Sequence, residues 1–291
     1  MPADASAFTS HRRLLFDIAY RMLGRVAEAE DAVQETWLRW QKQDAAAIDS
    51  PRAWLVATTT RLCIDQLRSA QRARTDYYGV WLPEPLVENS GASPAEAAAL
   101  ADSLTMAFML LLERLKPDER AVFLLREAFD YDYGDIAAIV EKSEAACRQI
   151  VSRAKARLAD AAQPPAPPSP RAETIVRQFL NATASGDVRD LLALLTDDAT
   201  LYADGGGRVV SVGRPIVTAD RISRFFVGVQ RWKLPDVNFR LARVNGRIGA
   251  LMFSAGRLVN AFSFEMSGDR IRTIFIVRNP EKLRHVAAGR N

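Results

Sequence analysis

The chain has 291 residues, of which 48% are hydrophobic and 25% charged, with a formal net charge of +4. This composition is ordinary for a globular protein, and the length allows two or three domains with their own cores. Two cysteines and two histidines do not favour a disulfide framework or a zinc site. No apolar run reaches the ~20 residues that a membrane span needs, and the first residues do not resemble a signal peptide. We therefore expect a cytoplasmic protein with no membrane contact and two small buried thiols.

Charge and composition change along the chain. Residues 171–291 hold 19 basic against 11 acidic residues, whereas residues 76–170 hold nine against 15. Five of the seven residues from 164 to 170 are proline, which indicates a stiff spacer. Before this spacer nearly every segment has helical periodicity, and after it come strand-like runs punctuated by turns. A softer boundary, rich in Pro, Gly, Ser and Asn, lies at residues 76–95.

The first helical block begins with an amphipathic helix over residues 26–40. Apolar residues recur every three or four positions and form its inner face. Taken alone, the opposite face is either a solvated surface or a docking surface. That face carries Glu30, Asp31, Gln34 and Glu35.

A basic helix follows, with Ser50 as its N-cap and Pro51 at the first helical position. Trp54 lies near its apolar stripe, so we expect it in the core. Five arginines against one acidic residue suit a phosphate backbone. The polar positions that we single out are Arg61, Asp65, Arg68 and Arg72.

The second helical block predicts a helix-turn-helix. Pro117 opens a helix that carries apolar residues as far as Phe129, and a short helix begins near Tyr133. Lys142 lies in the turn and Ser143 is a credible N-cap for the last helix. A recognition helix places such residues on base edges and phosphates. Outside its apolar face lie Arg148, Gln149, Ser152, Arg153, Lys155 and Arg157.

The stretches "EAEDAVQETWLRW" and "SPRAWLVATTTRLCIDQLRSA", followed by this helix-turn-helix, resemble the extracytoplasmic-function (ECF) sigma factors of bacterial RNA polymerase. The resemblance implies binding to the polymerase core (β and β′ subunits), with the acidic face of residues 26–40 on the β′ coiled coil. It implies that the basic helix contacts the −10 promoter element and that the loop 43–49 captures an unstacked base. The last helix then contacts the −35 element, and promoter melting needs no catalytic residue, cofactor or metal.

The pattern of residues 172–291 predicts helices followed by a run of strands, with "VNGRI", "SAGRL" and "SGDRI" as hairpin turns. This order resembles the SnoaL-like, NTF2-like cone, and a subgroup of ECF sigma factors carries such a domain. The subgroup's motifs are present as "WLPEPL" (81–86), "DGGGR" (204–208) and "NPEKL" (279–283). Arg208 and Glu281 depart from the usual Lys and Asp while keeping the charge.

Three interpretations of the glycine motif stay open: a tight turn alone, a regulatory docking surface, or an active site. A phosphate loop does not fit, because Val209–Val210 reads as a strand. As a dock, the turn would hold the "WLPEPL" segment. An unidentified small ligand or regulator also stays open, as does a cyclase- or isomerase-like enzyme on DNA-binding helices. The regulatory contacts expected are Trp81, Pro83, Pro85, Asp204, Gly205, Gly206, Gly207, Arg208, Asn279, Pro280 and Leu283.

The sequence therefore predicts two all-α domains followed by an α+β cone. The expected function is that of an ECF sigma factor tuned in cis by its last domain, and a DNA-binding repressor is a further alternative. The expected divisions are 1–75, a linker at 76–95, 96–161, a proline-rich linker at 162–171, and 172–291.

Overall fold

The computed structural model describes residues 5–44, 48–74, 77, 79–87, 104–159, 170–232 and 234–288, without the side chains of residues 70–74 and 159. The chain forms two compact units. The first combines Met1–Asp76 with Met109–Gln163, and the second combines Tyr77–Phe108 with Pro164–Asn291. The chain therefore leaves the first unit after residue 76 and returns to it at residue 109. Nearly all of the proline-rich linker, and residues 88–95 of the first linker, lie outside the described residues.

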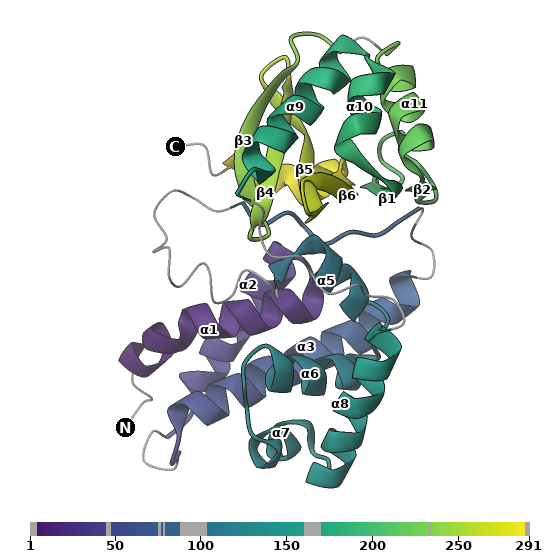
Figure 1. Ribbon diagram of the computed structural model, residues 1–291. Helices are drawn as coiled ribbons and strands as arrows, with labels where there is room; N and C mark the ends of the chain where they lie inside the picture. The colour runs from purple at the N-terminus through teal and green to yellow at the C-terminus, as the bar shows by residue number, and fades with distance from the viewer. Residues whose placement is uncertain are drawn as a thin grey trace. The chain divides into compact units, whose positions relative to one another are not determined.

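The described part of the N-terminal unit is all helical (Figure 1). Helix α1 packs on α2 and α3, helices α6, α7 and α8 pack on one another, and α3 also contacts α6 and α7. The helices are α1 (Ala5–Leu23), α2 (Val26–Trp40), α3 (Pro51–Arg74), α5 (Met106–Leu112), α6 (Pro117–Glu127), α7 (Tyr133–Val140) and α8 (Glu144–Ala159).

The predicted helix starts are confirmed by hydrogen bonds. The Ser50 hydroxyl accepts from the Ala53 N–H at 3.3 Å, and the Ser143 hydroxyl accepts from the Ala146 N–H at 3.2 Å. The prediction that α6 carries Phe129 is wrong, because the helix ends at Glu127. Asp130 adopts a φ of 55°, which turns the chain out of the helical direction.

Two arginines join the helical blocks of this unit in a reciprocal way. Arg120 of α6 is buried and donates to the Met22 carbonyl at 2.7 Å, near the C-terminal end of α1. Arg61 of α3 donates to the Ala138 and Ile139 carbonyls at 2.9 and 2.8 Å, near the end of α7. Each arginine thus satisfies carbonyl groups that a helix end leaves without an intrahelical partner.

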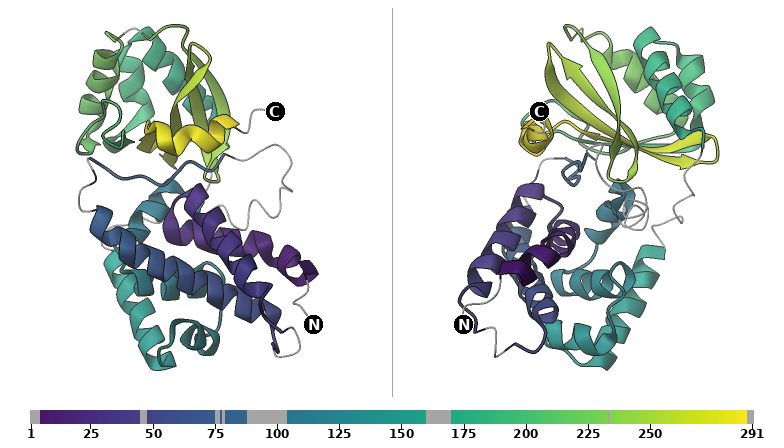
Figure 2. Two further views of the ribbon diagram at one scale, coloured as in Figure 1. Left: turned by 180° about the vertical axis from the view of Figure 1, so that it is seen from behind. Right: turned by 90° about the vertical axis from the view of Figure 1, so that its left-hand side faces the viewer.

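The C-terminal unit is a six-stranded sheet with helices on both faces. Its strand order is β2-β1-β6-β5-β4-β3, in which only β1 and β6 run parallel. Helices α9, α10 and α11 cover one face and α12 lies on the other (Figure 2). The elements are α9 (Ala172–Ser185), α10 (Val188–Leu194), β1 (Leu195–Asp204), β2 (Ile216–Val217), α11 (Ala219–Val229), β3 (Asn238–Val244), β4 (Arg247–Ser254), β5 (Arg257–Ser267), β6 (Arg270–Val277) and α12 (Pro280–Ala288).

The predicted hairpins are confirmed. Asn245 and Gly246 connect β3 to β4, and both have positive φ, at 52° and 73°. Ala255 and Gly256 repeat this geometry between β4 and β5. Two consecutive residues of positive φ make the tight turn whose twist matches that of antiparallel strands.

Alternation along β1 separates two faces of the sheet. Leu201 and Ala203 belong to the hydrophobic core beneath the helices, where Phe179 of α9 packs edge-on against neighbouring aromatic rings. Tyr202 and Asp204 point to the opposite face, where the Tyr202 ring stacks on that of Phe275 at 5.4 Å. The sheet therefore has a second packed face, away from α9–α11.

The prediction of a strand at Val209–Val210 is wrong. The turn after β1 closes with the Arg208 N–H donating to the Gly205 carbonyl at 3.0 Å, and the chain then continues without regular structure. The physical reason is that β2 and β6 already pair with the two edges of β1, so no edge remains for a strand there. Val210 is accordingly 68% exposed.

Candidate functional site

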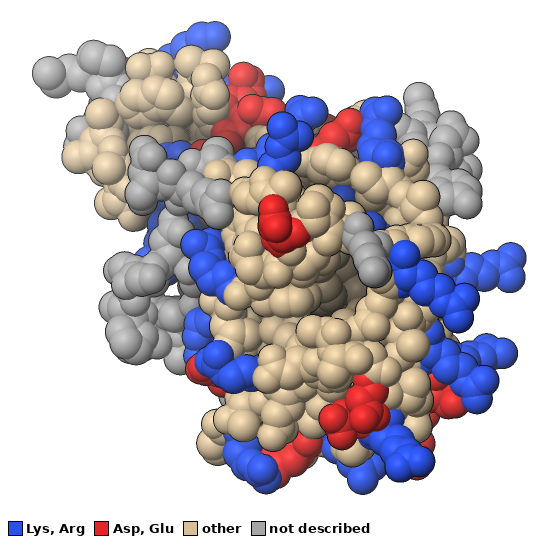
Figure 3. Space-filling view, turned by 90° about the horizontal axis from the view of Figure 1, so that it is seen from above, with Lys and Arg blue, Asp and Glu red and all other residues tan. Residues whose placement is uncertain are grey.

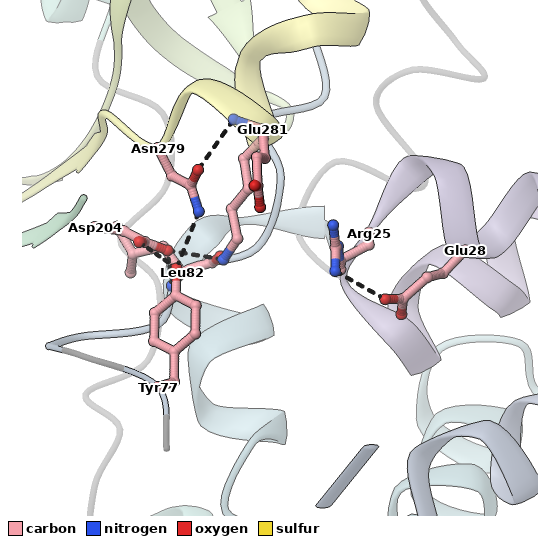
Figure 4. A network of polar contacts seen from close by, with 8 residues as sticks. Arg25, Glu28, Tyr77, Leu82, Asp204, Asn279 and Glu281 are labelled. Carbon is pink, nitrogen blue, oxygen red and sulfur yellow. Dashed lines mark hydrogen bonds and ion pairs between the residues drawn. The ribbon is translucent and has the colours of Figure 1, made fainter. Parts of the chain in front are cut away.

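The first half of the linker binds a buried carboxylate of the C-terminal sheet. Asp204, at the end of β1, accepts from the Tyr77 hydroxyl at 2.5 Å and from the Leu82 N–H at 2.9 Å (Figure 4). Lys282 of α12 donates to the same carboxylate at 2.7 Å and also to the Leu82 carbonyl. Both side chains of this ion pair are nearly inaccessible, with exposures of 0% for Asp204 and 3% for Lys282. A buried charge pair needs such additional hydrogen bonds to offset its lost hydration.

Aromatic rings of the linker cover the lysine. The ammonium of Lys282 lies 4.3 Å from the centroid of the Trp81 ring and 5.1 Å from that of Tyr77. These are cation–π distances. Leu82 is fully buried beside them. The linker thus contributes apolar, aromatic and backbone groups to one shared core with β1 and α12.

Residues 85–87 of the linker pair with the turn between β3 and β4 and with α12. The Leu86 N–H donates to the Asn245 side-chain carbonyl at 3.0 Å, and the Leu86 carbonyl accepts from the Asn245 N–H at 2.8 Å. Val87 forms an antiparallel bridge with Val244. His285 of α12 lies 2.8 Å from the Pro85 carbonyl. We call Asp204, Asn245, Lys282 and His285 the linker dock.

The triglycine forms a tight turn next to this dock. Gly206 and Gly207 have φ of 60° and 67°, in the region that glycine tolerates. A Cβ on Gly206 would overlap the Asn279 amide and come within 3.2 Å of the Tyr77 hydroxyl. The glycine therefore permits the close approach of Asn279, whose amide donates to that hydroxyl at 3.3 Å.

The two departures from the subgroup's motifs contact each other. Arg208 of "DGGGR" and Glu281 of "NPEKL" form an ion pair of 3.0 Å. Asn279 caps α12 by accepting from the Glu281 N–H at 3.0 Å, with Pro280 at the first helical position. The two motifs, which lie about 75 positions apart in the sequence, thus form one structural feature.

The remaining predicted linker contacts are buried within the same unit. Pro83 and Pro85 are buried, Trp81 is half-buried and Leu283 is 3% exposed, whereas Pro280 lies at the surface. The nearest neighbours of the glycine turn are Asn279 and Tyr77 beside Gly206, and Val209 and Ser211 beside Gly205.

The acidic face of α2 is largely solvent-accessible. Asp31 and Gln34 are exposed, and Glu30 and Glu35 are partly covered. Glu30 pairs with Arg12 of α1 at 2.5 Å, and Glu35 pairs with Arg39 one turn along at 2.8 Å. These pairs are exposed, so exchanging them for an outside partner costs little.

Several predicted DNA contacts instead bind other parts of the N-terminal unit. Arg61 caps α7, as described above, and also lies 3.4 Å from Glu141. Arg68 pairs with Asp118 of α6 at 2.8 Å, more closely than with Asp65 at 3.5 Å. Lys142 contacts the same Asp118 at 3.2 Å. Arg72 lies on α3, and its side chain is outside the described residues.

Helix α8 exposes the polar side that the sequence predicts. Cys147, Val151, Ala154 and Leu158 are buried, which leaves the opposite side of the helix exposed. Arg148 pairs with Glu144 at 2.6 Å and its guanidinium lies 4.9 Å from the Tyr133 ring centroid. The exposed side comprises Arg148, Gln149, Ser152, Arg153 and Lys155, together with Arg157, which pairs with Glu119 at 2.8 Å.

A surface pocket of about 340 Å³ opens between the end of α2 and the first turns of α3. It adjoins the loop 43–49, whose residues 45–47 lie outside the described part of the chain. Trp54 is half-buried, packed against Trp40 at 5.3 Å between ring centroids, so it contributes both to the core and to the pocket wall. Cations and an aromatic wall suit a nucleotide. The lining residues are Arg39, Lys42, Gln43, Trp54, Thr58 and Arg61.

Charged side chains of both signs lie on the surface drawn in Figure 3. Lys and Arg side chains lie mostly toward the margin of the view with Asp and Glu side chains among them, and one acidic side chain lies near a hollow in the middle. Among the described residues no group of three or more His, Cys, Asp or Glu side chains is arranged to hold a metal ion. No described helix is long and apolar enough to cross a membrane. Both cysteines are free thiols, buried as predicted.

Comparison with known proteins identifies the family. Residues 7–73 match the Sigma-70 region 2 family and residues 105–158 match the Sigma-70, region 4 family. The ECF RNA polymerase sigma factor SigJ of Mycobacterium tuberculosis is 38% identical over 294 residues, which cover 96% of this chain and 93% of SigJ. This chain belongs to the ECF sigma factors. Probable ECF RNA polymerase sigma factor SigI of the same species is 30% identical over 96% of this chain and 94% of SigI.

The crystal structure of SigJ confirms the fold class of this sigma factor. It matches with a TM-score of 0.76 at 32% sequence identity, and the match covers 96% of this chain and 98% of that chain. Two helical domains followed by an α+β domain are thus the architecture of both proteins. RNA polymerase core and promoter DNA are the partners of this family.

Sequence reasoning missed most of the linker dock. It selected Asp204 but not Asn245, Lys282 or His285, and it did not select Tyr77. Lys282 lies inside the quoted "NPEKL" motif, and that motif was the one available signal. Asn245 and His285 lie outside the quoted motifs, so the sequence contained no comparable signal for them.

Proposed function

We propose that this sigma factor recruits RNA polymerase through the acidic face of α2, with Glu30, Asp31, Gln34 and Glu35 on the β′ subunit and further contacts to β. The accessibility of these side chains supports the proposal, as do their weak, exposed internal ion pairs. The protein then acts where the polymerase acts, in the cytoplasm. The corresponding functional division assigns residues 1–75 to core and −10 binding and residues 96–161 to −35 binding.

The promoter is read at two places in this proposal. Helix α8 enters the major groove at the −35 element, with Arg148, Gln149 and Ser152 toward the bases and Arg153 and Arg157 toward phosphates. Its exposed polar side supports this role, and Lys142 and Ser143 lie at its entry.

The melted −10 strand follows α3, with Arg61, Asp65, Arg68 and Arg72 along its path. The pocket beside loop 43–49 supports capture of one unstacked base, because arginine and lysine side chains and the Trp54 ring line it. Arg61 and Arg68 must exchange their present partners to take part.

The predicted C-terminal domain, residues 172–291, tunes initiation in cis by holding the linker that joins the two DNA-binding blocks. One observation carries this proposal: the linker shares a buried ion pair and a β-bridge with the C-terminal sheet. Because the linker joins the −10 and −35 modules, anchoring its residues 77–87 on this sheet limits the positions that the two modules can adopt.

We propose a regulatory rather than catalytic role for this unit. Every carboxylate oxygen of Asp204 is engaged by Tyr77, Leu82 and Lys282, so the group is not presented to a substrate. Tyr202 stacks on Phe275 within the same packed face. A small ligand or another regulator acting on this unit belongs to the same proposal.

Transcription in vitro with purified polymerase core tests the proposal. We compare the full chain with Asp204→Asn, which releases Tyr77 and Leu82, with Asn245→Ala, which releases Leu86, and with Asp269→Asn as the matched control. Asp269 forms an exposed ion pair with Arg171 in the same unit. We expect at least a threefold change in transcript yield for the two linker variants, with unchanged core binding. Equal yields from all four proteins would overturn cis regulation through the linker.

A further inference from the structure

Arg278 extends the helix-covered face of the sheet by one residue. Its N–H donates to the Asp204 carbonyl at 2.7 Å, which continues the ladder between β1 and β6 beyond Val277. Ile274 and Ile276, two and four positions earlier, belong to the core beneath α9–α11. Alternation therefore directs the Arg278 side chain toward the helices, whereas the linker dock lies on the opposite face.

This arginine has no counter-charge within the described part of the chain. Its guanidinium forms no ion pair with a described carboxylate, and its buried Nε has no hydrogen-bond partner there. Burial lowers the pKa of the Arg278 guanidinium. Because a desolvated cation is costly unless an anion or acceptors surround it, this position favours an anionic partner.

Two more polar groups converge on the same corner. Asn260 of β5 stands opposite Arg278 when the register of Phe262 and Ile276 is continued by two residues. It is 8% exposed, its amide donates to the Met252 sulfur at 3.1 Å, and its Oδ1 has no partner among the described residues.

The third group is the hydroxyl of Ser211. Its Oγ is buried and likewise has no partner among the described residues. An added Cβ on Gly205 would lie 2.6 Å from Ser211 Cβ, so Ser211 lies beside the residue that follows Asp204. Asp204 is the residue whose carbonyl binds the Arg278 N–H. Arg278 Nε, Ser211 Oγ and Asn260 Oδ1 are thus two donors and an acceptor, and none of these three atoms has a hydrogen-bond partner in the described part of the chain.

Apolar side chains extend from this corner across the sheet. Phe239, Met252 and Asn260 occupy one row over β3, β4 and β5. Phe239 and Met252 are only partly covered, and Val212 packs against the same core. A ligand that fits this row is apolar over most of its length and polar at one end.

We propose that Ser211, Asn260 and Arg278 bind a small apolar carboxylic acid that carries a hydroxyl near its carboxylate. Arg278 and Ser211 donate to the carboxylate, and Asn260 Oδ1 accepts from the ligand's hydroxyl. The apolar chain lies along Met252 and Phe239. This site deepens the proposed regulatory role of the C-terminal unit by naming the class of its ligand.

Isothermal titration of the full chain tests the site without polymerase, so its outcome is separate from that of the transcription experiment. The probes are 3-hydroxybutanoate, 3-hydroxyhexanoate and 3-hydroxydecanoate, with decanoate lacking the hydroxyl and methyl 3-hydroxydecanoate lacking the charge. We expect the affinity to increase with chain length. We also expect the acid to bind about tenfold more tightly than its ester.

Variants assign the contacts. Arg278→Gln should weaken 3-hydroxydecanoate binding about tenfold, while Arg270→Gln, at an exposed position of the same strand, should not. Asn260→Ala should remove the preference for 3-hydroxydecanoate over decanoate. If Arg278→Gln fails to fold, the comparison of acid and ester on the unaltered chain decides whether the site recognises the carboxylate charge. Absence of binding by all three hydroxy acids at millimolar concentration, or equal binding of acid and ester, would overturn the proposal.

Discussion

The Asp204 carboxylate and the Lys282 ammonium lie 2.7 Å apart in the C-terminal unit, and both are withdrawn from solvent. Neither charge has water to replace its partner, so the pair acts together with the linker groups that bind it. This relationship ties the linker to the sheet more firmly than an exposed ion pair does.

Breaking this pair should destabilise the protein strongly. We expect Asp204→Asn or Lys282→Met alone to lower the free energy of unfolding by about 3–5 kcal/mol, because each leaves a buried charge without its partner. Urea unfolding of the full chain measures this loss of free energy. The double variant should recover part of the loss, and Asp269→Asn should change stability by less than about 0.5 kcal/mol. Full additivity of the two single losses would contradict a coupled pair.

The acidic face of α2 should govern polymerase binding. Glu30→Lys and Glu35→Lys each reverse the charge of a partly accessible side chain on this face, so we expect core capture in a pull-down to fall at least tenfold. Glu173→Lys is the matched control, since Glu173 also forms an exposed i,i+4 pair with an arginine, on α9. Undiminished capture by both α2 variants would remove the main support for the docking face.

Arg148 should contribute to −35 recognition. Replacing it with alanine should weaken binding to a −35 duplex by about 1–3 kcal/mol if it contacts a base. Arg177→Ala is a close control, because Arg177 pairs with Glu173 at 2.9 Å as Arg148 pairs with Glu144 at 2.6 Å. Fluorescence anisotropy at fixed salt gives both affinities. Equal losses from the two variants would indicate a nonspecific charge effect.

Asp118 competes with DNA for the cations of the promoter-binding surface. It binds both Arg68 and Lys142, so Asp118→Asn should free them and raise the affinity for a melted −10 strand severalfold. Asp130→Asn is the control, since Asp130 is 96% exposed and lies 3.8 Å from Arg126, away from the residues proposed to contact DNA. Weaker binding by Asp118→Asn would show that this carboxylate organises the surface instead.

Glu119 should make stability depend on pH. Burial by itself would raise the pKa of its carboxyl, but hydrogen bonds from the Lys116 N–H and from Arg157 outweigh it and hold the pKa below the ordinary value. Its contribution is therefore complete above the unfolded pKa of about 4.3 and is lost as the pH falls through the lower folded pKa.

Glu119→Gln measures this contribution. We expect this substitution to lower the free energy of unfolding by about 1 kcal/mol at pH 7 and by much less near pH 3. Urea unfolding at both pH values measures the difference. Glu173→Gln, on an exposed surface, should show no such difference. A cost that is independent of pH would mean that the charge of Glu119 does not contribute.

Local chemistry made much of this fold predictable. Ser50 and Ser143 cap their helices as expected, and Asn245–Gly246 forms the expected hairpin turn, because each acts within a few residues of its own backbone. The family motifs likewise stand in continuous stretches. Amphipathic spacing of α2 and α8 was sufficient to separate the inner from the outer side of each helix.

Only the tertiary structure decided what those motifs contact. It placed Lys282 and Asp204 in one buried pair, brought the linker to Asn245, and showed that Arg61 caps α7. It also showed that Val209–Val210 has no strand to pair with. These outcomes depend on burial and on which sheet edges are occupied. The buried pair, the linker contact and the α7 cap each join residues more than 70 positions apart, and the edges of β1 are filled by β2 and β6. Helical or strand periodicity relates none of these residues.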